Sequence, residues 1–138
     1  MMPRLGLIAG NGRFPLLLTE AAQREGVEII AVAHTGETPD EIVTLVPTVT
    51  WVGGGELGKI IDTFHRAGVT QVVMAGGISK AGAFAHFQPD ERGMAFISTL
   101  SSLKDDVILR GVARELESEG IVVVDSTRFL SAPVPSEG

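Results

Sequence analysis

The feature that most constrains the fold is a short apolar run that ends directly in glycines and is followed by a helical pattern. Residues 4–9 form such a run and lead into Gly10-Asn11-Gly12. Residues 14–25 then carry apolar side chains at helical spacing until Gly26, which is typical of the end of a helix. The order predicts a strand, a tight glycine turn and a helix.

The same unit occurs again further along the chain. Residues 49–52 run into Gly53-Gly54-Gly55, and the helical pattern of residues 56–67 ends at Gly68, where a left-handed cap is expected. Repetition of strand, turn and helix favours parallel strands joined by helical crossovers.

Five apolar runs in all are interpreted as strands, and they are near-continuous, which is typical of a parallel sheet covered on both faces. Right-handed crossovers then predict an α/β fold, a Rossmann-like doubly wound sheet in the order 3-2-1-4-5 with helices on both faces. Residues 105–119 predict a further helix capped by Gly120, and residues 79–102 a loop with one or two short helices. The runs are residues 4–9, 27–33, 49–52, 69–75 and 121–124.

The 138 residues suit a single domain, which we expect to cover residues 1–130. Residues 131–138, with the sequence SAPVPSEG, have the composition of a linker and no periodicity. We therefore expect an interdomain linker to start there.

Composition excludes several classes of protein. A net charge of −6 with only 11 scattered Lys and Arg residues argues against a nucleic-acid partner. The absence of cysteine rules out disulfides and thiolate metal sites and suits the cytoplasm. No apolar run approaches the roughly 20 residues that span a bilayer, so any membrane contact is expected to be peripheral.

Candidate ligand-binding residues lie in the loops that follow the predicted strands, because ligands of open α/β sheets bind beyond the carboxyl ends of the strands. Glycine there permits a positive φ and a close approach of backbone N–H groups to a phosphate. The alternative is that these glycines only make tight turns. The candidates are Gly10, Asn11, Gly12, Gly53, Gly54, Gly55, Gly76, Gly77, Ser79, Lys80, Asp125, Ser126 and Thr127.

Two of these loops allow a sharper statement. After Gly10 and Gly12, Pro15 stands where the dinucleotide fingerprint has its third glycine, so an NAD site is disfavoured. In the loop from Gly76, Lys80 supplies a cation that is suited to a phosphate, although a lone lysine is equally consistent with a solvated surface.

Candidate metal ligands are few. Asp105 and Asp106 are suited to Mg²⁺, but carboxylates in the first turn of a helix also complement its macrodipole. The three histidines show no metal spacing, and no nucleophile elbow, Walker loop or zinc motif is present. The sequence thus predicts a binding domain and leaves catalytic residues unassigned.

Five segments resemble the amino-terminal domain of the LpxI-type UDP-2,3-diacylglucosamine diphosphatase family. They cover nearly the whole chain in the family's order, and the first and last are the most distinctive. They are GLIAGNGRFP (residues 6–15), VGGGELGK (52–59), VMAGGISK (73–80), LKDD (103–106) and VDSTRFL (124–130).

The resemblance implies hydrolysis of the pyrophosphate of UDP-2,3-diacylglucosamine to UMP and 2,3-diacylglucosamine 1-phosphate (lipid X) in lipid A synthesis, with Mg²⁺ (or Mn²⁺) as cofactor. It also implies a carboxyl-terminal domain that carries most of the carboxylate chemistry and is absent here, so this chain alone is expected to be inactive. A homodimer and a peripheral contact with the inner membrane surface are compatible with it. The alternative function is a stand-alone nucleotide-binding or oligomerisation module without activity.

Overall fold

The computed structural model describes residues 3–79, 81 and 85–126 and contains the predicted alternation of strands and helices. Most strands end within a residue or two of their predicted limits because glycine loops or turns stop them. The elements are β1 (Arg4–Ala9), α1 (Phe14–Arg24), β2 (Glu28–His34), α2 (Ile42–Leu45), β3 (Val49–Val52), α3 (Leu57–Arg66), β4 (Gln71–Ala75), α5 (Glu91–Ser98), α6 (Asp105–Glu117) and β5 (Val122–Val123).

The strands form one parallel sheet in the order β3-β2-β1-β4-β5, which confirms the predicted topology. In this register Ala9, the last residue of β1, lies between Ala33 of β2 and Ala75 of β4. Because the strands are parallel, the loops that follow them all leave the same edge of the sheet.

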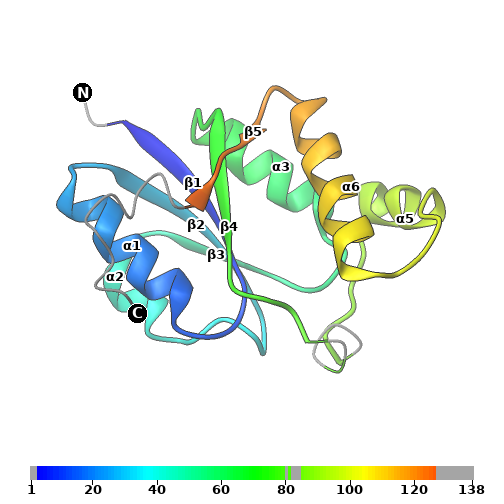
Figure 1. The fold of residues 1–138 in the computed structure, drawn as a ribbon, viewed down its shortest axis with the longest axis horizontal. Coiled ribbons are helices and arrows are strands. Elements are labelled where there is room, and N and C mark those ends of the chain that lie inside the picture. The colour runs from blue at the N-terminus through cyan, green and yellow to red at the C-terminus, as the bar shows by residue number, and fades with distance from the viewer. Residues whose placement is uncertain (1–2, 80, 82–84, 127–138) are drawn as a thin grey trace.

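Helices cover both faces of the sheet, with α1 and α2 on one side and α3, α5 and α6 on the other (Figure 1). Alternate residues of β1 supply the two cores: Leu7 packs in the core beneath α1, and Ile8 packs against the core beneath α3. Phe64 of α3 and Leu116 of α6 are fully buried in that second core. The near-continuous apolar strands thus reflect burial on both faces.

Several details differ from the predictions. Strand β5 is shorter than residues 121–124, and the one-turn helix α2 was not predicted because four residues carry no helical periodicity.

Gly26, Gly68 and Gly120, which follow α1, α3 and α6, all have positive φ, as a left-handed cap requires. The predicted linker at residues 131–138 lies outside the described residues.

Within the described part of the chain, no helix combines the length and the apolar character needed to cross a membrane.

Candidate functional site

The candidate site lies at the carboxyl edge of the sheet, where β1 and β4 are neighbours. The connection after β1 runs through α1 to β2 on one side, whereas β4 lies on the other side of β1. Doubly wound folds bind their ligands at such a reversal of strand order, in a place known as the crevice, which in this chain is the sheet edge at the ends of β1 and β4.

The loops after β1 and β4 contact each other through their backbones. The N–H of Gly10 donates to the Ala75 carbonyl at 2.8 Å, and the N–H of Asn11 donates to the Gly77 carbonyl at 2.7 Å. A Cβ atom at Gly10 would clash with the Gly77 carbonyl oxygen, and one at Gly76 would clash with the Asn11 carbonyl oxygen. Glycine is required at both positions because the two main chains approach so closely.

Gly12 differs from these two glycines because it faces open space. Its φ is +82°, and a Cβ atom built there would meet nothing within 4 Å. In the described structure the N–H groups of Gly12 and Arg13 have no hydrogen-bond partner, and they precede the first turn of α1. Backbone donors and the positive end of a helix dipole together favour an anion at this point.

A carboxylate that the sequence analysis missed joins the loops. Glu37, three residues after the end of β2, accepts hydrogen bonds from the Asn11 side-chain amide at 2.9 Å, from the Ser79 N–H at 3.0 Å and from the Ser79 hydroxyl at 2.9 Å. These bonds lower the pKa of Glu37, with the backbone bond from Ser79 contributing most and partial burial opposing it.

His34, the last residue of β2, is near enough to this carboxylate for the two charges to interact. Its Nδ1 is 2.8 Å from the Ala9 carbonyl oxygen, which also accepts the Thr38 hydroxyl at 2.8 Å. Burial lowers the pKa of His34, although the Ala9 carbonyl and the Glu37 charge act in the opposite direction. The neutral ring therefore donates from Nδ1 and ties β2 to the end of β1.

Whereas the loops after β1 and β4 contact each other, the loop after β3 packs against residues 86–90. The N–H of Gly53 donates to the Glu56 carboxylate at 2.6 Å, and the N–H of Gly54 donates to the His86 carbonyl at 2.9 Å. A Cβ atom at Gly55 would lie 2.9 Å from Pro89. These glycines thus pack against residues 86–90, and two of their three N–H groups are already used within the chain.

The remaining predicted residues are spread over the same edge or fall outside the described structure. Asp125 and Ser126 follow β5, one strand beyond β4. Lys80 and Thr127 lie outside the described residues. The structure therefore brings together Gly10, Asn11, Gly76, Gly77 and Ser79, with Gly12 beside them.

The carboxylates singled out as metal ligands stand apart from this cluster. Asp105 and Asp106 begin α6 and are exposed, and Asp106 forms an ion pair with Arg110 at 3.3 Å. Among the described residues, no three His, Asp or Glu side chains come together as a metal site would require.

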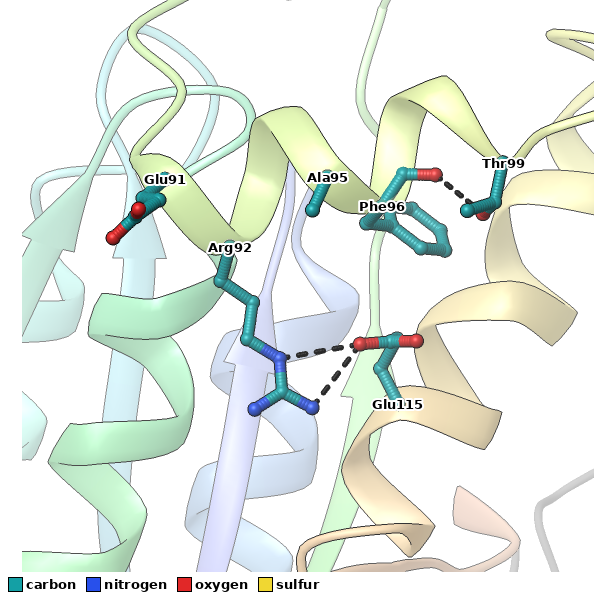
Figure 2. Close-up of a pocket in the computed structure, with 6 residues that line it drawn as sticks. All are labelled: Glu91, Arg92, Ala95, Phe96, Thr99 and Glu115. Atoms are coloured by element: carbon teal, nitrogen blue, oxygen red, sulfur yellow. Dashed lines mark hydrogen bonds and ion pairs between the residues drawn. The ribbon is translucent and has the colours of Figure 1, made fainter.

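A surface hollow between α5 and α6 is a competing place for a ligand (Figure 2). Arg92, the one cation among the described residues that line it, is already paired: it reaches from α5 to Glu115 of α6 at 3.1 Å and also contacts Glu119. These bonds raise the pKa of Arg92, and the contact with Glu119 contributes most. The network joins two helices and leaves no free cation among these lining residues for an anionic ligand, so the crevice between β1 and β4 is the better candidate.

Comparison with known proteins gives a consistent result. The family model described as the LpxI N-terminal domain matches residues 4–132. The UDP-2,3-diacylglucosamine pyrophosphatase LpxI of Caulobacter vibrioides is 34% identical over 125 residues, which are 88% of this chain and 44% of that protein. The chain thus spans less than half the length of this relative.

Among solved structures, the biotin carboxylase subunit of pyruvate carboxylase is similar to 89% of this chain, over 22% of its own length, with a TM-score of 0.50 and 14% identity. At that identity the likeness concerns the fold alone.

Proposed function

The chain belongs to the LpxI N-terminal domain family, and on this premise we propose that it binds the nucleotide diphosphate in a hydrolase of UDP-2,3-diacylglucosamine. The reaction cleaves the pyrophosphate and yields UMP and 2,3-diacylglucosamine 1-phosphate. Neither the family match nor the Caulobacter relative favours the alternative, a stand-alone module without activity.

One observation carries this proposal: the open backbone donors of Gly12 and Arg13 at the crevice between β1 and β4. They precede α1, so they combine hydrogen-bond donors with the positive end of the helix dipole. A diphosphate offers several oxygens with negative charge and suits such a site without any lysine or arginine side chain. In this proposal Gly10 and Gly76 keep the two loops close enough for both to contact one ligand.

The proposed division of labour follows from what the crevice holds. Glu37 is engaged by three donors and His34 donates to a backbone carbonyl, so neither is arranged as a nucleophile or as a base for water. We therefore assign binding and orientation to this chain, and hydrolysis to a partner domain in the part of the longer relative that the chain does not span.

A divalent cation belongs to the proposal for the whole enzyme only. In the part of the chain that the structure describes, Asp105 and Asp106 lie in no cluster of metal-ligating groups, and Asp106 is paired with Arg110. The described residues alone do not fit a resident Mg²⁺ or Mn²⁺ site, and no step is assigned to the metal here.

Two further partners are proposed because of the substrate's chemistry and the family resemblance. A substrate with two acyl chains resides in a membrane, so we propose a peripheral contact with the inner membrane surface. A homodimer is proposed on the resemblance alone.

The test follows UMP release from UDP-2,3-diacylglucosamine with this chain, with the part of the Caulobacter relative that it does not span, and with both together. We expect neither part to turn over substrate alone and the mixture to release UMP. A mixture containing Gly12→Val should be much slower. Turnover by this chain alone would contradict the division of labour, and a mixture no better than its parts would argue against the proposed partner domain.

A further inference from the structure

The three loops at the crevice are joined by one side chain, that of Glu37. We propose that Glu37 is a positioning residue, which holds the loops after β1 and β4 at the separation where their backbone donors bind an anion. The inference rests on the proposed function for its ligand. Glu37 itself does not bind the ligand in this proposal: it contacts the loops, and the N–H groups of the loops contact the ligand.

The Glu37 side chain reaches two loops that follow different strands. Glu37 follows β2, yet its carboxylate accepts from Asn11 after β1 and from Ser79 after β4. Strands β2 and β4 are not neighbours, since β1 lies between them. The side chain therefore extends over the end of β1 and fixes loops that the sheet itself does not hold together.

Glu37 also sets the orientation of the Asn11 amide. Its Nδ2 donates to Glu37 at 2.9 Å, while its Oδ1 accepts the N–H of Gly77 at 3.2 Å. A carboxylate is only an acceptor, so it requires the amide nitrogen on its own side. Glu37 thereby directs the oxygen towards Gly77 and adds a second link between the two loops.

The negative charge of Glu37 is used within the chain. A carboxylate that faced a diphosphate would repel it, but the oxygens of Glu37 are satisfied by three donors from the loops. Its lowered pKa keeps it ionised at neutral pH, as an acceptor for all three. Glu37 is thus better suited to holding Asn11 and Ser79 in place than to contacting the ligand itself.

Variants at this position separate reach from charge. Glu37→Gln keeps the length: its oxygen can accept from Asn11 and from the Ser79 N–H, and its amide can donate to the Ser79 hydroxyl, which also accepts. Glu37→Asp keeps the charge but is shorter, and Glu37→Ala removes both. Asp40→Ala is the matched control, because it removes an exposed carboxylate from the same loop that has no side-chain partner among the described residues.

Two measurements are made on each variant: amide hydrogen exchange at residues 10–13 and 76–79 without ligand, and the Kd for UDP. For Glu37→Ala and Glu37→Asp we expect exchange at Gly77 and Ser79 to rise about tenfold and UDP binding to weaken on the order of tenfold. Glu37→Gln should stay within about threefold of the parent chain, and Asp40→Ala should match it. If Glu37→Ala fails to fold, the contrast between Glu37→Asp and Glu37→Gln decides.

Three results would overturn the inference. Faster exchange with unchanged UDP affinity would make Glu37 a purely structural residue, and unchanged exchange would mean that it does not hold the loops. Loss of affinity in Glu37→Gln with none in Glu37→Asp would indicate that charge matters and reach does not. If the parent chain itself does not bind UDP, the proposed function fails, and exchange in the ligand-free variants still decides whether Glu37 fixes the loops.

Discussion

Ser79 donates two hydrogen bonds to the carboxylate of Glu37, from its N–H to Oε1 at 3.0 Å and from its hydroxyl to Oε2 at 2.9 Å. The pair joins the loop after β4 to the loop after β2, across the end of the intervening strand β1. The crevice is therefore organised by side-chain contacts as well as by the sheet, and this arrangement leads to specific predictions.

Replacing Asn11 by Asp puts a second carboxylate beside Glu37, 2.9 Å from one of its oxygens. We expect Asn11→Asp to lower the free energy of unfolding at pH 7 by about 1–3 kcal/mol, because two carboxylates cannot both ionise there without repulsion. The loss should shrink as the pH falls and the pair takes up a proton. Urea unfolding at pH 7 and at pH 4.5 measures the loss in the free energy of unfolding relative to the parent chain. Asn11→Ala, which adds no charge, is the control. If its loss also shrank by the same amount at pH 4.5, charge repulsion would not be the explanation.

Gly12 and Gly26 form a matched pair of glycines. Both have positive φ, +82° and +80°, and both face open space, but Gly26 lies at the far end of α1. We expect Gly12→Ala and Gly26→Ala each to lower the free energy of unfolding by about 1 kcal/mol through backbone strain. Only Gly12→Ala, and more strongly Gly12→Val, should weaken UDP binding, measured by calorimetry. Equal UDP affinity in the Gly12 and Gly26 variants would leave Gly12 with the role of a turn residue.

Gly93 tests the structural role of the loop after β3. A Cβ atom at Gly93 would clash with the Gly55 carbonyl, so Gly93→Ala must push α5 away from that loop. We expect a loss of roughly 2 kcal/mol in the free energy of unfolding and a UDP affinity within about twofold of the parent chain. Chemical denaturation and a UDP titration measure the two quantities. A large loss of affinity with little loss of stability would place the loop of Gly53–Gly55 in the binding site.

Acid should destabilise the domain in two steps. Burial lowers the folded pKa of His34 below the ordinary value of about 6.5, so below that pH the unfolded chain binds more protons and stability falls. The pKa of Glu37 is also lowered, chiefly by the backbone bond from Ser79, so a second loss begins below about pH 4.3.

Urea midpoints measured from pH 8 to about pH 2.5 follow both steps. His34→Asn replaces the ring donor with an amide that does not titrate. The urea midpoint of this variant should therefore change little with pH between about pH 6.5 and the second step, and the second step should remain. A slope that persists unchanged in His34→Asn would assign the first step to another group.

The sequence predicts the sheet well because its signals are local. Apolar runs that end in glycine define β1, β3 and β4, and the handedness of the crossovers then gives the strand order. The contacts of Gly53–Gly55 could not be predicted in this way, because their partners are more than thirty residues further along the chain, at residues 86–90. A glycine loop that binds a ligand and one that packs on backbone have the same sequence pattern.

Glu37 was missed for a related reason. In the sequence it is one of three carboxylates in the polar stretch HTGETPDE (residues 34–41) after β2, and such residues are usually solvated. The available signal was its position, just after a strand that ends at the same edge as the glycine loops. Its partners, Asn11 and Ser79, lie 26 and 42 residues away, and only the fold brings them together.

Whether the backbone donors that precede α1 bind a nucleotide is tested by titrating the isotope-labelled chain with UDP and following the NMR shifts of its backbone amides. We expect saturable shifts that are largest at Gly12, Arg13 and residues 76–79, around the open donors that precede α1. Shifts confined to Arg92, Phe96 and Glu115 in the hollow between α5 and α6, or no shift at Gly12 and Arg13, would contradict it.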